Sequence, residues 1–180
     1  METRVIKVRR ESDVPQAAGE GARVLAAGGL VGFPTETVYG VAAVATDDGA
    51  MQRLREIKDR PERPFSVHLG DPQAASRCVQ DPPRRARWLM ERAWPGPLTL
   101  LLPTGGALAD ARLNDERLYA RLCWDDTIGL RCPSDAVALR MLSGVQAPVV
   151  APSANPAGAA SPRTADDVLD GLDGQIDLLI

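Results

Sequence analysis

Hydrophobic and polar residues alternate along this chain with two different periods. Residues 3–8 and 64–69 alternate with a period of two, which predicts strands because successive side chains of a strand point to opposite faces. Met51, Leu54 and Ile57 recur at helical spacing, which predicts a helix. The two periods intermingle along the chain, and this pattern is typical of an α/β fold.

Capping residues, glycines and prolines set the limits of the predicted elements. We predict strands over residues 3–8, 30–33, 41–46, 64–69, 97–103, 128–132 and 176–180, and one more short strand that begins at residue 148 and runs into a loop. We predict helices over residues 12–29, 47–60, 71–79, 82–94, 133–144 and 161–172, and an irregular polar excursion over residues 104–127. Strands and helices do not follow a strict strand–helix–strand order, so we expect a mixed sheet flanked by helices.

Length and composition favour one domain. The 180 residues suffice to bury a sizeable core, and we expect a single domain over residues 1–180. Hydrophobic residues make up 44% of the chain but aromatic residues only 4%, so Leu, Val, Ala and Ile must build the core.

Charge and cysteine usage exclude several classes of protein. The net charge of −3 provides no overall basic field, so nucleic-acid binding would need a local patch. Cys78, Cys123 and Cys132 are odd in number, far apart and without a CxxC pair, which predicts reduced thiols rather than a disulfide framework or a zinc site. The sequence has no apolar run typical of a signal peptide or a membrane span, so we expect a soluble cytoplasmic protein.

A first polar cluster, "GFPTETVYG" (32–40), follows an apolar run. Its hydroxyl groups, Thr35 and Thr37 among them, lie at the end of a buried strand, where open α/β sheets bind ligands. The alternative is a turn or a helix cap in which these two threonines satisfy local amides.

A second cluster, "KDRPERP" (58–64), contains Lys58, Arg60 and Arg63. Only Lys7 and Lys58 among the 21 basic residues are lysines. Pro61 directs Arg60 away from helical conformation, so we expect Lys58 and Arg60 to project together into a cleft that binds phosphate or carboxylate. The alternative is a helix C-terminus with cations that complement its dipole.

Two further clusters follow apolar strands. In "FSVHL" (65–69) Ser66 and the single histidine, His68, share one face, and a lone strand histidine is often merely structural. In "APSANPAG" (151–158) we expect Ser153 and Asn155 to point the same way, since Pro156 favours an extended Asn155; an ordinary Asx or Ser turn is the alternative. The chain has neither a GxxxxGK nor a GxGxxG motif. The residues alone therefore predict an α/β domain with a cationic, hydroxyl-rich cleft for a small anion.

Five segments together resemble, in order, the YrdC family of threonylcarbamoyl-AMP synthases. The segments are "GGLVGFPTETVYGV", "EIKDRPERPFSVHL", "AWPGPLTLLLP", "IGLRCP" and "PVVAPSANPAGAASP". The resemblance runs from about Gly28 to Ile180. It implies a YrdC-like twisted mixed open sheet with flanking helices and a concave cleft. It also implies a nucleotidyltransferase that makes threonylcarbamoyl-AMP and pyrophosphate from L-threonine, bicarbonate and ATP for tRNA N6-threonylcarbamoyladenosine modification.

The resemblance also implies roles for individual residues. ATP would be a substrate, with Mg²⁺ held through its phosphates, no metal site on the protein, and a tRNA-modifying threonylcarbamoyl transferase as partner. The implied sites are Lys58 and Arg60 for catalysis; Thr35, His68 and Thr99 for threonine; Lys58, Arg60, Arg131, Ser153, Asn155 and Ser161 for the nucleotide; and Thr37 and Tyr39 for the cleft wall.

The sequence departs from the family pattern at its end. Family domains usually continue past the strand corresponding to residues 176–180 into a Gly-rich turn and a strand resembling E-S-T-V-V-D. We therefore expect the chain to be truncated at its C-terminal end.

Two rival functions use the same residues. One is a non-catalytic YrdC-like module that binds tRNA or double-stranded RNA, with Arg84, Arg85 and Arg87 extending a basic patch; the scarcity of aromatic residues for stacking argues against it. The other is the related carbamoyl-transfer domain of hydrogenase maturation proteins, which normally accompanies zinc-finger-like cysteine pairs that are not seen in this sequence.

Overall fold

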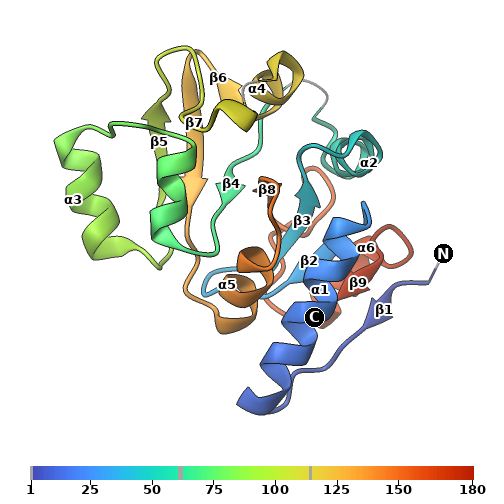
Figure 1. Ribbon diagram of the computed structural model, residues 1–180. Helices are drawn as coiled ribbons and strands as arrows, with labels where there is room; N and C mark the ends of the chain where they lie inside the picture. Colours follow the sequence, from blue (N-terminus) through green and yellow to red (C-terminus); the bar gives the residue numbers. More distant parts are fainter. Residues whose placement is uncertain (1, 61–62, 114) are drawn as a thin grey trace.

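The computed structural model describes residues 2–60, 63–113 and 115–180, and its strands form one mixed sheet (Figure 1). The strands lie in the order β1-β9-β2-β3-β8-β4-β7-β5, and β6 also pairs with β7. Neighbours β1–β9, β9–β2 and β4–β7 are parallel, whereas the other pairs are antiparallel. The predicted mixed α/β fold is confirmed.

Most strands are short. They are β1 (Arg4–Val5), β2 (Val31–Phe33), β3 (Gly40–Val44), β4 (Val67–His68), β5 (Thr99–Pro103), β6 (Cys123–Trp124), β7 (Thr127–Arg131), β8 (Val149–Val150) and β9 (Leu178–Leu179). The predicted strand positions agree with the structure, although regular pairing covers only part of each predicted range.

Helices cover both faces of the sheet. The α-helices are α1 (Val14–Ala26), α2 (Asp48–Lys58), α3 (Arg84–Ala93), α4 (Glu116–Leu122), α5 (Ala136–Ser143) and α6 (Ala165–Leu172); 3-10 helices span Glu11–Asp13, Pro72–Arg77 and Ala111–Leu113. Side-chain caps fix several starts, for example Asp47, which accepts a hydrogen bond from the Ala50 N–H at the start of α2.

Alternating side chains of β3 belong to two separate hydrophobic clusters. Val41 and Ala43 join the cluster that includes α2 and α6, whereas Ala42 and Val44 join the cluster that includes α1 and α5. Every residue of β3 is buried, because helices cover the strand on both faces.

Small residues let α1 lie close against α5. A Cβ at Gly21 would approach the Met141 Sδ to 2.6 Å and the Ile180 Cδ1 to 2.9 Å, so a side chain at this position of α1 would displace both buried side chains. Ala17, Ala18 and Ala22 complete the same buried face of α1. The result is a closely packed layer under β2, β3 and β9.

Two predictions of secondary structure were wrong in detail. Residues 71–79 contain a 3-10 helix, Pro72–Arg77, rather than an α-helix. Residues 104–127 are not an irregular excursion: they include the 3-10 helix Ala111–Leu113, α4 and β6. The apolar signal of α4 is only Leu118 and Leu122, four residues apart among charged residues, and it is too short to stand out in the sequence.

The three cysteines are free and buried; the sequence predicted that they form no disulfide framework but did not predict their burial. Burial raises the pKa of the Cys78 and Cys123 thiols to about 11 and that of Cys132 to about 12. Within the three described stretches, no helix has the length and apolar character needed to cross a membrane.

Candidate substrate cleft

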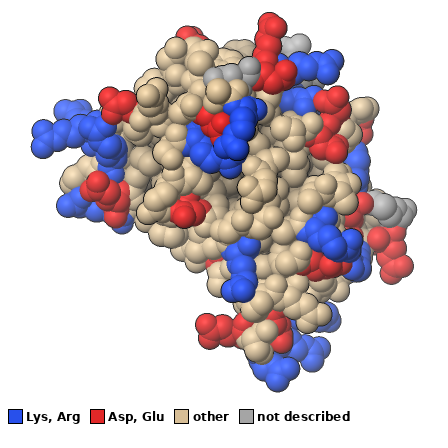
Figure 2. Space-filling view, in the orientation of Figure 1, with Lys and Arg blue, Asp and Glu red and all other residues tan. Residues whose placement is uncertain are grey.

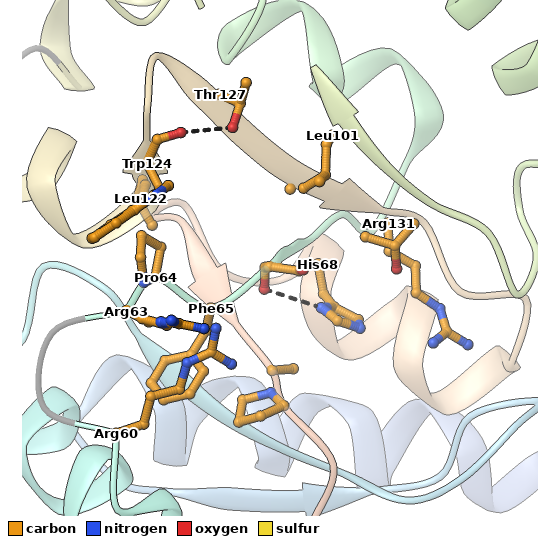
Figure 3. Close-up of a pocket in the computed structure, with 15 residues that line it drawn as sticks. Arg60, Arg63, Pro64, Phe65, His68, Leu101, Leu122, Trp124, Thr127 and Arg131 are labelled. Atoms are coloured by element: carbon orange, nitrogen blue, oxygen red, sulfur yellow. Dashed lines mark hydrogen bonds between the residues drawn. The ribbon is translucent and has the colours of Figure 1, made fainter. Parts of the chain in front are cut away.

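A cleft of about 530 Å³ lies over β4, β5 and β7 (Figure 3). Its lining combines cations, polar groups and exposed apolar side chains, among them Arg60, Arg63, His68, Thr99, Trp124 and Arg131. Such a mixture of an apolar surface and a few converging polar groups is typical of a small-molecule site.

The register of β5 on β7 builds the floor of the cleft. Thr99 pairs with Arg131 and Leu101 pairs with Gly129, and all four residues line the cleft. A Cβ at Gly129 would lie 2.8 Å from the Ser66 Oγ, so a side chain here would displace this hydroxyl. The pairing explains why Thr99 and Arg131, far apart in sequence, occupy one surface.

The Thr35 hydroxyl stabilises a local turn. Its Oγ1 donates to the Val38 carbonyl at 2.6 Å, and it lies 3.2 Å and 3.3 Å from the backbone N–H groups of Thr37 and Val38, which donate to it. The Thr37 Oγ1 is 3.0 Å from the Thr35 Oγ1. The turn that the sequence offered as an alternative is therefore present at Thr35, and its hydroxyl is already engaged locally.

Glu36 ties this turn to β7. Its carboxylate accepts a 2.7 Å hydrogen bond from the Arg131 Nη2 and a 2.9 Å bond from the Ser134 N–H. The same Arg131 Nη2 lies 2.8 Å from the Thr37 Oγ1. Partial burial by itself would raise the pKa of Glu36, but the hydrogen bonds from Arg131 and Ser134 outweigh it and hold that pKa below its usual value. The pair is therefore ionised at neutral pH.

Arg131 keeps one donor without an acceptor. Its Nε is buried and has no hydrogen-bond partner among the described residues, although its Nη2 is bound twice. A buried N–H without a partner is costly, by about 1–3 kcal/mol. Arg131 lines the cleft, but its Nε is enclosed by the protein and its Nη2 is bound to Glu36 and Thr37, so the residue contributes mainly its positive charge to the cleft.

Lys58 does not line the cleft but holds the loop that carries Ser153 and Asn155. Its Nζ donates to the carbonyl oxygens of Ser153 at 3.0 Å and Asn155 at 2.6 Å, and to the Asn155 Oδ1 at 3.2 Å. The Ser153 Oγ lies 3.5 Å away. The two polar side chains thus point the same way, as predicted, and they meet the ammonium group. Burial first, and then the Arg60 charge, lower the pKa of Lys58.

Lys58 and Arg60 diverge, contrary to the expectation that they project together. Asp59 between them has a φ of 42°, a left-handed conformation that ends α2 and turns the chain. The Arg60 guanidinium lies 5.4 Å from the centre of the Phe65 ring and lines the cleft with Arg63. Pro61, to which the sequence assigned this turn, lies outside the described residues.

His68 is a buried, neutral group inside the cleft. Only 8% of its surface is exposed, its Nδ1 lies 3.4 Å from the Ser66 carbonyl, and its ring meets the edge of Phe33. Burial, assisted by the Arg131 charge, lowers the pKa of His68 to about 4. The imidazole therefore offers uncharged hydrogen-bonding nitrogens at neutral pH.

Backbone bonds fasten the remaining predicted residues to this site. The Tyr39 N–H donates to the Pro162 carbonyl at 2.8 Å, and the Tyr39 carbonyl accepts from the Ala154 N–H at 2.9 Å. Tyr39 is partly buried, and Asn155 is buried with its Nδ2 bound to the Pro156 and Ala159 carbonyls. Ser161 is exposed, next to the proline that binds Tyr39.

The structure thus brings together some predicted residues and separates others. Arg60, His68, Thr99 and Arg131 line the cleft. Thr35, Thr37, Tyr39, Ser153, Asn155 and Ser161 do not line it; they belong to the turn and the loop at its border. Lys58, at the end of α2, does not line it either and binds that loop through its side chain.

Sequence reasoning missed several residues of the site, among them Glu36, Leu101 and Trp124. Glu36 was visible inside the quoted motif, but nothing in the sequence indicated its pairing with β7. Leu101 and Trp124 line the cleft while 74% and 61% exposed. The alternation of residues 97–103 could have placed Leu101 on the face of Thr99; Trp124 lay in the segment predicted to be irregular. No group of three His, Cys, Asp or Glu residues able to hold a metal ion occurs in the described part of the chain.

Comparison with known sequences identifies one family model and several similar proteins. The Sua5_yciO_yrdC family model, described as "Telomere recombination", matches residues 23–180. Proteins named threonylcarbamoyl-AMP synthase are similar: that of Pyrococcus abyssi is 37% identical over 85% of this chain and 43% of its own length. That of Bacillus subtilis is 39% identical over 90% of this chain and 44% of its own length. That of Stutzerimonas stutzeri is 34% identical over 79% of this chain and 72% of its own length. The chain spans under half the length of the first two.

Solved structures have the same fold. A double variant of P. abyssi Sua5, H234A/Y235A, superimposes with a TM-score of 0.83 at 34% identity, covering 99% of this chain and 49% of the other. P. abyssi Sua5 complexed with L-threonine gives a TM-score of 0.76 at 33% identity, with the same coverage. Escherichia coli YciO, at 22% identity and a TM-score of 0.73, covers 99% of this chain and 82% of its own and shares the fold.

Proposed function

The chain belongs to the Sua5–YciO–YrdC family, and from this premise we propose that it makes threonylcarbamoyl-AMP and pyrophosphate from L-threonine, bicarbonate and ATP. The amine of threonine attacks the carbon of bicarbonate and water leaves, which gives a carbamate. A carbamate oxygen then attacks the α-phosphorus of ATP, the bond to the β-phosphate breaks, and pyrophosphate departs. The product is a mixed anhydride of the carbamate and AMP.

The observation that carries the proposal is the gathering of Arg60, Arg63 and Arg131 around one cleft that also contains the neutral His68. Negative charge develops on phosphorus oxygens during the second step, and fixed donors in a partly enclosed site stabilise such charge strongly. Glu36 holds the Arg131 guanidinium in place before any substrate arrives, so little reorganisation is needed. Arg60 and Arg63 supply two further guanidinium groups to the same cleft.

Threonine recognition is proposed for the His68 and Thr99 side of the cleft. P. abyssi Sua5, a homologous structure, is complexed with L-threonine. A neutral imidazole and a hydroxyl group are suitable partners for the hydroxyl and amine of that amino acid. Thr35 is part of this proposal only through a rearranged turn, because its hydroxyl already binds the Val38 carbonyl.

Lys58 and Arg60 share one proposed role, and Lys58 has a second. We keep both at the nucleotide phosphates, as the family resemblance implies, and add a positioning role for Lys58. Its Nζ binds two carbonyl groups of the loop that contains Ser153 and Asn155, so it orders this loop at the border of the cleft. Mg²⁺ is proposed to enter with ATP, held by the phosphates. A threonylcarbamoyl transferase acting on tRNA would consume the product.

The decisive test is incubation of the protein with ATP, Mg²⁺, L-threonine and labelled bicarbonate. We expect the label in an adenylate, with pyrophosphate released in step. Arg131→Gln should lower the rate by about a hundredfold, the effect of removing a donor that stabilises developing charge. Arg140→Gln, an exposed arginine of α5, is the matched control and should leave the rate unchanged. ATP binding without any labelled adenylate would overturn the proposal.

One observation favours a second candidate, contact with RNA. The helix α3 carries Arg84, Arg85, Arg87 and Arg92, and none of its residues is buried. Blue side chains project over this helix in Figure 2. Phosphate groups bind such patches with a strong dependence on salt. Filter binding with tRNA tests it: salt-dependent retention that Arg84→Gln combined with Arg85→Gln abolishes, in a protein that forms no adenylate, would favour this function over the first.

A further inference from the structure

Two large apolar side chains face solvent inside the cleft and have no part in the chemistry derived above. Leu101 of β5 is 74% exposed and Trp124 of β6 is 61% exposed, and both line the cleft. In Figure 3, Trp124 and Leu101 lie on either side of β7, and His68 lies between them and Arg131. An exposed tryptophan ring offers a flat apolar surface that water solvates poorly.

The β6–β7 hairpin holds Trp124 in a fixed place. Asp125 and Asp126 form its two-residue turn with φ values of 49° and 51°, as a type I′ turn requires. Such φ values are unfavourable for residues other than glycine, and strained turns of this kind often present functional groups. The Thr127 Oγ1 donates to the Trp124 carbonyl at 2.7 Å, which closes the hairpin beside the ring.

Neighbouring side chains hold the strained turn. The backbone N–H of Thr104 donates to the Asp126 carbonyl at 2.8 Å, and the Thr104 Oγ1 donates to the same oxygen at 3.0 Å. The Tyr119 hydroxyl donates to the Asp126 Oδ1 at 3.0 Å. The backbone that carries the exposed Trp124 ring is therefore held in place by its neighbours.

The same cleft provides cations at a distance from this ring. Thr127, which pairs with Trp124, and Arg131 lie four residues apart on β7, a separation of about 13 Å along an extended strand. Arg60 and Arg63 line the cleft as well. A nucleoside triphosphate combines a flat aromatic base with a polyanion, and so it matches an apolar ring together with guanidinium groups in one elongated cleft.

We propose that Trp124 stacks on the purine ring of ATP. The inference rests on the proposed function for its ligand, and it assigns the base-binding wall of that same site to the β6–β7 hairpin. Stacking makes Trp124 a determinant of affinity for the base, whereas the guanidinium groups bind the phosphates. Adenine and guanine both stack well on a tryptophan ring. Stacking alone therefore favours purine over pyrimidine nucleotides but distinguishes ATP from GTP only weakly.

The test compares two ligands that share the polyanion but differ in the base. ATP and inorganic tripolyphosphate, each with Mg²⁺, are titrated by calorimetry into the unaltered protein, Trp124→Ala, Trp124→Phe and Trp88→Ala. Trp88, 53% exposed on α3 with Arg92 4.4 Å from its ring, is the matched control outside the cleft. Trp124 is exposed, so its replacement should leave folding intact; the unfolding midpoint of each variant checks this.

Trp124→Ala should weaken ATP binding by about tenfold, within the range for loss of one base–aromatic stack, and leave tripolyphosphate binding unchanged. Trp124→Phe should restore most of the loss, and Trp88→Ala should bind both ligands as the unaltered protein does. Quenching of tryptophan fluorescence by ATP should persist in Trp88→Ala and disappear in Trp124→Ala.

The outcomes separate this inference from the proposed function. Equal weakening of both ligands, or no weakening of either, overturns stacking by Trp124 even if the protein makes the adenylate. Selective weakening of ATP in a protein that makes no adenylate supports the stacking and overturns the synthase function. A protein that binds no ATP overturns both.

Discussion

Apolar side chains are buried in the layer of α1 and α5 but exposed in the region of β5, β6 and β7. In the first, Gly21 and Met141 pack so closely that a single added carbon would clash. In the second, Leu101 and Trp124 remain largely exposed and the hairpin turn is strained at two aspartates. The two regions occupy opposite ends of the sheet in Figure 1. Close packing stabilises one end, and the other end is open for binding.

The largest expected effect is on stability in the α1–α5 layer. Met141 is fully buried, and Met141→Ala should lower the free energy of unfolding by about 3 kcal/mol, because it leaves a cavity beside Gly21. Urea denaturation followed by circular dichroism measures it. A loss as small as that of an exposed residue would show that the layer collapses around the cavity and is not closely packed.

His68 should make the cleft region sensitive to acid. Its pKa is about 4 in the folded protein and 6.5 without the fold, so the unfolded chain binds the extra proton between these values and stability falls as pH decreases through that window. From pH 7 to pH 5 this amounts to about 2 kcal/mol. His68→Gln should lose stability less steeply over the same range in urea titrations. Because the chain has one histidine, parallel curves would contradict the assignment.

Lys58 tests the loop at the border of the cleft. Lys58→Met leaves the Ser153 and Asn155 carbonyls without their donor and should cost about 1–2 kcal/mol of stability. It should also raise the apparent KM for ATP in the adenylate assay. Lys7→Met is the natural control, since Lys7 is the other lysine and is exposed. Equal stability and equal KM for ATP in the two variants would show that Lys58 has no positioning role.

The smallest effect is expected at Leu101. Its side chain is 74% exposed, so Leu101→Ser should change the free energy of unfolding by less than about 0.5 kcal/mol. Urea denaturation beside Met141→Ala provides the direct contrast between the two regions. A loss comparable to that of Met141→Ala would mean that the β5 face is covered in solution and is not an open wall.

Several strands and helices were predictable because their signals are local. The caps at Asp47 and Thr164, the glycines after α1 and the alternation around Val67 are each readable within a few residues. The resemblance in five ordered segments added the family, which the comparisons confirmed. Residues 104–127 failed because α4 has only two turns and β6 has two residues; their stability comes from packing on the sheet, which leaves little local pattern.

The intermingling of strands and helices could be read from local sequence patterns, and the same patterns located the polar clusters that we predict to form the site. Only the tertiary structure decided how these clusters divide. It directed Lys58 to the loop at Ser153, gave the Thr35 hydroxyl to a local turn, and set Arg131 between Glu36 and the cleft. The reason is physical: hydrogen bonds between residues about 95 positions apart depend on strand register and helix placement, which the whole core fixes together.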